Sequence, residues 1–410
     1  AYDIALAQQI KANAPGAKVM LDFHYSDTWA DPSKQFIPAA WSGQTLSQLE
    51  TSVTNYTQST LQSFYDAGVM PDIVQLGNET TGGIMWPTGQ LNFTGTVAQQ
   101  NASWAAYGGL LNAGIAGVRN VQSANGLSRI PVSLSIDKGD KDGQPQYHYQ
   151  YIQSSTTNPI PFTGGKTGGG VTDFDIEGVD FYSSSVSGIT TMKNNLTALA
   201  NTNTNNGLNT NPSKRIMLLE TNWPNGSGSS GYTGPTTWPK TPAGQEQEAK
   251  DVRNLMLSLP GGDGEGVLWW YPESVRVSGS TGYQNGVTAL FDNTSNHAAE
   301  PAIIDNVFAP IRGDFNSDGH FNAADIGAML NALVDLSTYQ KNTGFTNPDM
   351  KFLGDFNGDG VVTNADLQGL VTSLINGGGS TDPVPEPSTA WLMVIGTVAL
   401  LRHRLCRQAT

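Results

Sequence analysis

Short apolar runs alternate with longer segments of helical periodicity over residues 1–309. Apolar runs of about four to eight residues are typical of buried strands, and apolar residues that recur every three or four positions are typical of helices. We predict strands at residues 18–23, 72–76, 130–136, 178–182, 215–219 and 266–270. The predicted helices lie at residues 46–67, 97–121, 190–200 and 243–259. This alternation favours an α/β fold in which βαβ units form a parallel sheet.

Polar residues follow the C-terminal end of nearly every predicted strand. A (β/α)8 barrel has its active site at this end of its eight strands. A doubly wound sheet also binds ligands there, but it normally has a Gly-rich phosphate loop after an early strand, and this sequence has none. The chain starts at Ala1 inside a helical pattern, with no Met and no signal peptide. We therefore expect that the first two barrel strands precede Ala1, and that these 410 residues alone, with open barrel edges, are inactive or aggregated.

Two glutamates follow predicted strands. Glu79 ends a Gly-Asn-Glu tripeptide after the strand at 72–76, and Glu220 starts a Glu-Thr-Asn-Trp-Pro segment after the strand at 215–219. Barrel strand ends converge, so the two carboxyls can face each other across one cleft. Glycoside hydrolysis needs such a pair, in which a separation of about 5 Å implies retention and a wider one implies inversion. Either glutamate alone could equally be an exposed residue that caps the next helix.

A dense polar and aromatic run covers the first predicted strand and the loop after it. Residues 21–32 read Leu-Asp-Phe-His-Tyr-Ser-Asp-Thr-Trp-Ala-Asp-Pro. This run resembles the signature of the endo-β-1,4-galactanases of glycoside hydrolase family 53. The resemblance covers about residues 1–308, and its further segments are residues 74–79, 83–89, 220–224, 266–272 and 289–292.

The resemblance implies a (β/α)8 barrel in which the strand at 18–23 is the third. It implies that Glu79, on the fourth strand, is the acid/base and that Glu220, on the seventh, is the nucleophile. The implied reaction is the retaining endo-hydrolysis of β-1,4-galactosidic linkages in type I arabinogalactan or pectic galactan, with no cofactor for catalysis. Two alternatives stay open: a non-catalytic cell-surface protein that binds galactan, and a glycosidase with altered specificity. A binder has no need of both glutamates.

The candidate substrate-binding residues are polar or aromatic side chains near strand ends: His24, Asp27, Trp29, Asp31, Asn78, Trp86, Asp137, Tyr182, Trp223 and Trp270. Trp86, Trp223 and Trp270 offer flat faces for galactose, and Asn78 could hold a sugar 2-OH. Tyr182 could donate a hydrogen bond to Glu220. Each of the others could instead brace a loop.

Three positions depart from the family pattern. Ser135 stands where the family usually has His, and the sixth barrel strand ends Phe-Tyr-Ser instead of Tyr-Tyr-Pro. Tyr271 stands where a Glu usually follows the final Trp, with Glu273 two residues later. These changes concern the cleft walls and leave both glutamates in place.

The net charge is −14 and the sequence pI is near 4.6. Nucleic acid is therefore not an expected partner, since phosphate binding needs clustered Lys and Arg. A neutral polysaccharide and calcium are both compatible with this charge. The only cysteine is Cys406, so the chain has no internal disulfide.

Residues 310–377 contain two segments with Asp, Asn and Gly at the spacing of EF-hand loops. Oxygen ligands at positions 1, 3, 5 and 12, with Gly at position 6, suit calcium. The predicted ligands of the first loop are Asp314, Asn316, Asp318, His320, Asn322 and Asp325. Those of the second loop are Asp355, Asn357, Asp359, Val361, Thr363 and Asp366.

A calcium loop followed by one helix, present twice, resembles a type I dockerin. The two helices are predicted at 324–334 and 365–375, so this small domain should be all-α. We expect two structural Ca²⁺ ions, because a module of this size has too little core to fold alone. The resemblance implies a cohesin-bearing partner, and the alternative is a calcium-stapled module with no partner.

Residues 378–410 are predicted to be a linker and a sorting tail. A Val-Pro-Glu-Pro-Ser segment, an apolar run at 390–401 and Arg402, Arg404 and Arg407 resemble a PEP-CTERM tail. The apolar run is short for a spanning helix of about 20 residues. The resemblance implies sorting machinery as a partner and a secreted or cell-surface location in the outer envelope of a bacterium; the alternative is a weak membrane anchor.

Overall fold

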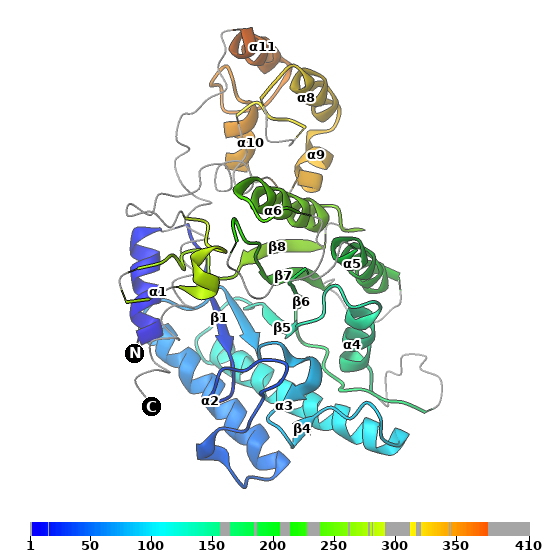
Figure 1. Ribbon diagram of the computed structural model, residues 1–410. Coiled ribbons are helices and arrows are strands. Elements are labelled where there is room, and N and C mark those ends of the chain that lie inside the picture. The colour runs from blue at the N-terminus through cyan, green and yellow to red at the C-terminus, as the bar shows by residue number, and fades with distance from the viewer. Residues whose placement is uncertain are drawn as a thin grey trace.

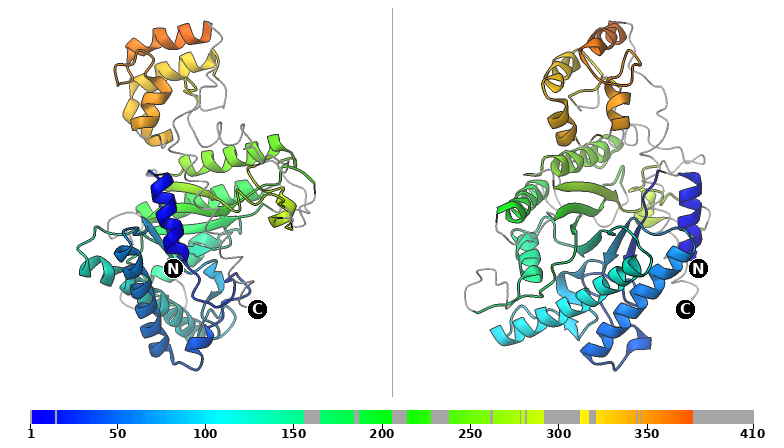
Figure 2. Two further views of the ribbon diagram at one scale, coloured as in Figure 1. Left: turned by 90° about the vertical axis from the view of Figure 1, so that its left-hand side faces the viewer. Right: turned by 180° about the vertical axis from the view of Figure 1, so that it is seen from behind.

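A computed structural model describes residues 2–14, 16–155, 165–183, 187–205, 214–227, 238–260, 263–277, 279–280, 282–291, 312–316, 321–343, 345 and 347–375. Its main body is a curled parallel sheet with helices on the convex side (Figures 1 and 2). The sheet strands are β1 (Met20–Phe23), β2 (Ile73–Leu76), β5 (Val132–Ile136), β6 (Ile176–Phe181), β7 (Arg215–Thr221) and β8 (Gly264–Trp269). Their order in the sheet follows the chain, β1-β2-β5-β6-β7-β8, and every pair is parallel. The prediction of six parallel strands is confirmed.

The helices of this body are α1 (Tyr2–Asn13), α2 (Leu46–Asp66), α3 (Val97–Ala124), α4 (Gln144–Gln153), α5 (Gly188–Asn205) and α6 (Pro242–Leu257). Capping boxes start α2 and α3, where the Thr45 and Thr96 hydroxyls accept backbone N–H groups of the first turn. The sequence prediction missed α4, whose many polar and aromatic residues hide the helical period. It also missed a two-stranded hairpin, β3 (Gly83–Ile84) with β4 (Gly89–Gln90).

Residues alternate between the two faces of the sheet. Val74, Leu134, Val179 and Leu218 pack outward in the large core beneath the helices. A second, inner core lies on the concave face and contains Ile73, Ile176, Met217 and Leu219, with Met20 and Leu268 packed against it. This apolar layer closes the lower part of the concave face, so that polar side chains nearer the carboxyl ends of the strands stand above it.

The pairing of β6 with β7 contains a register shift. Val179 pairs with Leu218, but the next residue, Asp180, pairs with Glu220, so Leu219 is an extra residue in β7. A β-bulge of this kind redirects the side chains that follow it. As a result Leu219 belongs to the inner core and Glu220, its neighbour in sequence, is also on the concave side.

Residues 312–375 form a second group of helices, which lies beyond α6 in Figure 1. The helices are α8 (Ala324–Val334), α9 (Leu336–Thr343), α10 (Asn347–Gly354) and α11 (Leu367–Ile375). Phe315, Met329, Leu353 and Leu370 make its own small core. The predicted all-α character holds for the residues described here. None of the described helices is long and apolar enough to cross a membrane, and the predicted tail at 378–410 lies outside the described residues.

Candidate active site

Glu79 lies just after β2, at the carboxyl edge of the sheet. Its backbone is left-handed, with φ 47° and ψ 51°, a conformation that few residues with a side chain adopt. The Glu79 N–H donates to Ser135 Oγ at 3.0 Å, and the Gln35 side-chain amide donates to the Asn78 carbonyl at 2.7 Å. Strain of this kind costs about 1–3 kcal/mol and is typical of functional sites. These contacts therefore fix the direction of a strained residue.

Glu220 is half-buried on β7, beyond the bulge. The Tyr182 hydroxyl donates a hydrogen bond of 2.7 Å to Glu220 Oε2, which confirms the contact predicted from the sequence. Among the residues that the structure describes, no hydrogen bond to the other carboxylate oxygen, Oε1, is seen. Glu220 is thus held at one oxygen and has the second available for chemistry.

The structure brings Glu79 and Glu220 together. One carboxylate oxygen from each of them, and one from Asp180, all lie within 4.8 Å of one another. Retaining glycosidases have their two carboxyl groups about 5–5.5 Å apart, whereas inverting enzymes need room for a water between them. The spacing here is that of a retaining pair.

The surroundings of the two glutamates separate their pKa values. Burial, together with the nearby charges of Glu220 and Asp137, raises the pKa of Glu79 to about 9. Burial also raises the pKa of Glu220, to about 8, and the hydrogen bond from Tyr182 limits this rise because it stabilises the ionised form. Glu220 is therefore the first of the pair to lose its proton, and Glu79 stays protonated to higher pH.

Asp180 is a member of this cluster that the sequence prediction missed. It is 1 % exposed and lies opposite Glu220 in the β6–β7 pairing. The signal was present, because Gly178, Asp180 and Tyr182 alternate along one predicted strand and so share a face. Burial and the charges of Glu220 and Glu79 raise the pKa of Asp180 well above its usual range.

Residues 2–304 match the family model described as glycosyl hydrolase family 53. The chain belongs to this family. Residues 312–375 match a second model, described as the dockerin type I domain. The matched regions correspond to the two bodies that the structure shows, each with its own core.

The curated relatives and solved structures agree with this family. The arabinogalactan endo-β-1,4-galactanase of Thermothelomyces thermophilus is 31% identical over 277 residues, which are 66% of this chain and 72% of that protein. The enzyme of the same name from Humicola insolens is 31% identical over 276 residues, with the same coverage. A structure of fungal β-1,4-galactanases is 29% identical, with a TM-score of 0.56 over 73% of this chain and 79% of that one. The family 53 catalytic domain of Ignisphaera aggregans has a TM-score of 0.55 at 23% identity and supports the fold, over 73% of this chain and 76% of that one.

Three predicted substrate-binding residues of this glycoside hydrolase meet beside β1. His24 accepts the Ala30 N–H at Nδ1 (3.2 Å) and places Nε2 2.9 Å from Asp22, so its proton is on Nε2. Trp29 lies edge to face with both His24 and Trp270, with ring centroids 5.7 Å apart in each case. The family 53 domain therefore has an aromatic group at this end of the sheet, formed from β1 and β8 loops.

Other predicted residues brace the loops around the glutamates. Asp27 accepts the Ala39 N–H at 2.6 Å, and Asp31 accepts the Ser33 hydroxyl at 2.6 Å and pairs with Lys34. Asn78 is buried and donates to the Ala30 carbonyl at 3.0 Å. Asp137 accepts the Thr81 hydroxyl and pairs with Lys138. These contacts support the loop-bracing alternative for Asp27 and Asp31, and they leave Asp137 as a charge that acts on Glu79.

The two remaining tryptophans differ. Trp86 is half-buried and donates its indole N–H to the Gly82 carbonyl at 3.0 Å, in the segment that follows Glu79. Trp223 is 0 % exposed, packs against Trp238 and donates to the Pro239 carbonyl at 3.1 Å. The predicted stacking of Trp223 on substrate is therefore wrong for this structure: its ring fills the core beside α6.

The departures from the family pattern lie close to the pair. Ser135 is fully buried and its hydroxyl accepts the Glu79 N–H, so the smaller group that stands in place of the usual His holds the Glu79 backbone. Tyr271 stacks on Tyr283 with centroids 4.9 Å apart. Burial raises the pKa of Glu273 to about 7.

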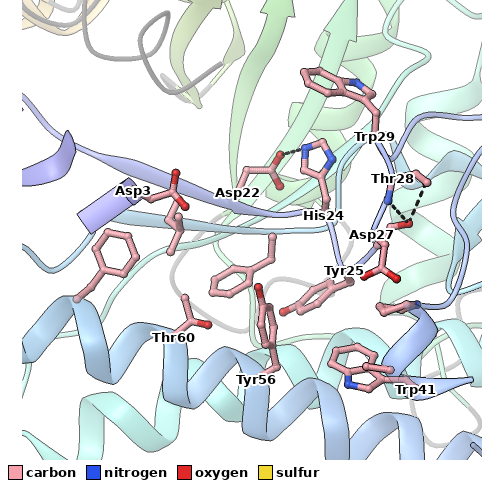
Figure 3. Close-up of a pocket in the computed structure, with 16 residues that line it drawn as sticks. Asp3, Asp22, His24, Tyr25, Asp27, Thr28, Trp29, Trp41, Tyr56 and Thr60 are labelled. Atoms are coloured by element: carbon pink, nitrogen blue, oxygen red, sulfur yellow. Dashed lines mark hydrogen bonds and ion pairs between the residues drawn. The ribbon is translucent and has the colours of Figure 1, made fainter. Parts of the chain in front are cut away.

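A separate cavity of about 470 Å³ runs along β1 toward α1 and α2. Figure 3 shows the Asp22–His24 pair at its upper side and the rings of Tyr25, Tyr56 and Trp41 on its other side. Neither Glu79 nor Glu220 lines it.

In the second calcium loop predicted from the sequence, the backbone folds around the carboxylates of Asp355 and Asp366. The Asp355 carboxylate accepts the Gly358 and Gly360 N–H groups at 2.7 and 2.9 Å. Asp366 is fully buried, and its carboxylate accepts the N–H groups of Asn357 and Thr363. The loop is wrapped around carboxylates at positions 1 and 12, which are hard oxygen donors of the kind that Ca²⁺ prefers.

The first loop is described in part. Asp325 is fully buried and accepts the Asn316 and Asn322 N–H groups at 3.2 and 2.8 Å, the same arrangement as Asp366 in the second loop. Asp314 is also buried. Asp318 and His320 lie outside the described residues. The donor set that is described fits the predicted calcium chemistry.

Proposed function

We propose that this protein is a retaining endo-β-1,4-galactanase that acts on type I arabinogalactan or pectic galactan, with Glu79 as acid/base and Glu220 as nucleophile. The observation that carries the proposal is the pair of carboxyls within 4.8 Å at the carboxyl edge of the sheet, one of them held by Tyr182. The names of the family 53 relatives support the choice of substrate.

In the first half of the reaction, Glu220 Oε1 attacks the anomeric carbon and the glycosidic C–O bond breaks. Glu79 gives its proton to the leaving oxygen, and an ester forms between the sugar and Glu220. The hydrogen bond from Tyr182 favours the ionised form of Glu220 before attack. Burial keeps Glu79 protonated at neutral pH.

In the second half, ionised Glu79 takes a proton from water, the water oxygen attacks the anomeric carbon, and the Glu220 ester breaks with retention. Glu79 is thus restored as an acid. Trp29 and Trp270 provide apolar faces for the substrate, and His24 provides a polar group beside them.

The decisive experiment measures reducing-end release from β-1,4-galactan by the full-length natural protein and by Glu79→Gln, Glu220→Gln and Glu246→Gln. We expect Glu79→Gln to lower kcat/KM by about 10²- to 10⁴-fold, the usual share of acid–base catalysis, and Glu220→Gln to lower it further. Glu246 pairs with Lys250 on α6 and is the matched control, with little effect expected. Galactan binding without turnover in the unaltered protein would favour a binding protein, and equal activity in all variants would refute the assignment.

We also propose that the dockerin domain binds two structural Ca²⁺ ions through the predicted ligands of its two loops and attaches the enzyme to a cohesin-bearing protein outside the cell. When bound, the ions would supply positive charge for the buried carboxylates of Asp325 and Asp366. A cohesin-bearing protein that fails to bind the calcium-loaded chain would favour a purely stabilising module. The proposed sorting tail remains a prediction from the sequence.

A further inference from the structure

Asp180 is a buried carboxyl that the mechanism above does not use. It is 1 % exposed, and neither of its carboxylate oxygens has a hydrogen-bond partner among the residues that the structure describes. One of its oxygens lies within 4.8 Å of carboxylate oxygens on both Glu79 and Glu220. A buried polar group without a partner destabilises the fold. The position of Asp180 beside both glutamates therefore suggests that it has a function there.

The position of Asp180 is set by the backbone. The bulge in β7 brings Glu220 opposite Asp180, and alternation along β6 puts Asp180 and Tyr182 on the same face. Tyr182 holds one oxygen of Glu220, and Asp180 has an oxygen within 4.8 Å of both Glu220 and Glu79. Asp180 therefore lies near both glutamates, and in this structure it donates to neither.

The neighbours of Asp180 are themselves acidic or phenolic. The titratable groups that face it are Glu220 on β7, Glu79 after β2, Asp137 after β5, Asp22 on β1, and the phenols of Tyr182 and Tyr149. Carboxyl groups this close cannot all be ionised. Burial and these charges raise the pKa of Asp180 well above its usual range, so the protonated form is favoured.

We infer that Asp180 is a positioning residue that keeps its proton through the reaction and donates a hydrogen bond to whichever catalytic glutamate carries the negative charge. The inference rests on the proposed retaining mechanism. Before attack, Glu220 is ionised, and Glu79 and Asp180 are protonated. In the glycosyl-enzyme, Glu79 is ionised, Glu220 is a neutral ester, and Asp180 is still protonated.

The proton count explains why one neutral carboxyl suits both states. The three carboxyls carry one negative charge before attack and one afterwards, because the proton that Glu79 gives to the leaving group is matched by the charge that Glu220 loses on forming the ester. The charge moves from Glu220 to Glu79. One Asp180 oxygen is within 4.8 Å of both glutamates, so a side-chain shift that closes this gap to hydrogen-bond distance would let a single O–H serve each in turn.

Asp180→Asn and Asp180→Ala test the inference. The amide of Asn keeps a neutral N–H donor of similar shape, whereas Ala removes it. Loss of a hydrogen bond to a charged group predicts a fall in kcat of about 10- to 100-fold for Asp180→Ala, with KM little changed. The fall in log kcat for Asp180→Asn should be no more than half of the fall for Asp180→Ala.

The pH profile separates this role from that of a charged Asp180. If Asp180 were ionised, its charge would raise the pKa of Glu79, and Asp180→Asn would move the alkaline limb of kcat/KM to lower pH. The inference predicts that this limb stays in place or moves to higher pH. A downward shift, an Asp180→Asn variant as impaired as Asp180→Ala, or a rise in KM with unchanged kcat would each overturn it.

Infrared spectroscopy provides a readout that does not depend on galactanase activity. The difference spectrum between the unaltered protein and Asp180→Asn at pH 7 should show loss of a protonated-carboxyl C=O band. Asp175→Asn is the matched control, since Asp175 directly precedes β6 and its carboxylate is ion-paired with Arg129 at 2.7 Å, so this substitution should remove no such band. Loss of an ionised-carboxylate band in Asp180→Asn would refute the inference even if the proposed galactanase activity is confirmed. Confirmed protonation in an enzyme inactive on galactan would leave the substrate proposal as the one that failed.

Discussion

Tyr182→Phe removes a single hydroxyl that donates to Glu220 Oε2 at 2.7 Å. A hydrogen bond to a charged group is worth about 1.5–3 kcal/mol, and 1.36 kcal/mol corresponds to one pKa unit. Glu220 is half-buried in an open cleft, so the lower end of this range applies. We therefore expect the pKa of Glu220 to rise by about one unit in the variant. The direction is upward because the lost bond stabilises the ionised form.

The assay is the pH dependence of initial rates on β-1,4-galactan, followed by reducing-end release between about pH 4 and 9. The acidic limb of kcat/KM reports the nucleophile of the free enzyme. It should move to higher pH by about one unit, and kcat/KM below the limb should fall about tenfold.

Tyr65→Phe is the control for this experiment, because Tyr65 is 37 % exposed on α2 and its ring does not reach the glutamates. Its acidic limb should match that of the unaltered enzyme. An acidic limb that moves by less than about 0.3 pH unit in Tyr182→Phe, with normal thermal stability, would refute the role given to Tyr182.

Two further predictions concern stability, and a third concerns calcium binding. In Gly178→Ala the added Cβ would lie 2.1 Å from Leu219 Cδ1 and 2.5 Å from the Leu134 carbonyl oxygen. The free energy of unfolding, measured by urea titration, should therefore fall by about 1–3 kcal/mol. Gly266→Ala is the control and should show a smaller loss, because its Cβ would lie 3.9 Å from Met217 Cε. Burial raises the pKa of Glu248 from its ordinary value near 4.5 to about 8. Between these two pH values the folded state binds more protons than the unfolded state, so the stability of the protein declines as pH rises. Glu248→Gln should flatten this decline of the melting temperature with pH, and an unchanged slope would contradict the prediction. Asp366→Ala should reduce calcium binding in calorimetric titration from two sites per chain to one, whereas Asp349→Ala, outside both loops, should keep two.

Much of the site was predictable from local patterns. Apolar runs located the strands, and a polar residue directly after a parallel strand must lie at the carboxyl edge of the sheet, which gave Glu79 and Glu220. The predicted hydrogen bond from Tyr182 to Glu220 is confirmed. The spacing of Asp, Asn and Gly in the calcium loops depends on a local turn geometry, so it could be read without tertiary information.

Other features depend on contacts between distant segments. Trp223 looked like a cleft residue, but it packs on Trp238 beneath α6, and nothing in its local sequence indicates which side of the sheet its ring takes. The helix α4 forms although its sequence has weak helical periodicity, because the rings of Tyr149 and Tyr151 pack into the outer core. In both cases tertiary packing decided the outcome.

The sequence by itself determined that two glutamates end parallel strands and that a duplicated loop presents carboxylates at calcium spacing. Only the tertiary structure decided that carboxylate oxygens of Glu79, Glu220 and Asp180 lie within 4.8 Å of one another. Strict alternation would put Leu219 and Glu220 on opposite faces of β7, and the register shift against β6 brings both to the concave side. A shift of this kind is set by the pairing of two strands that are distant in sequence, so no local pattern could have shown it.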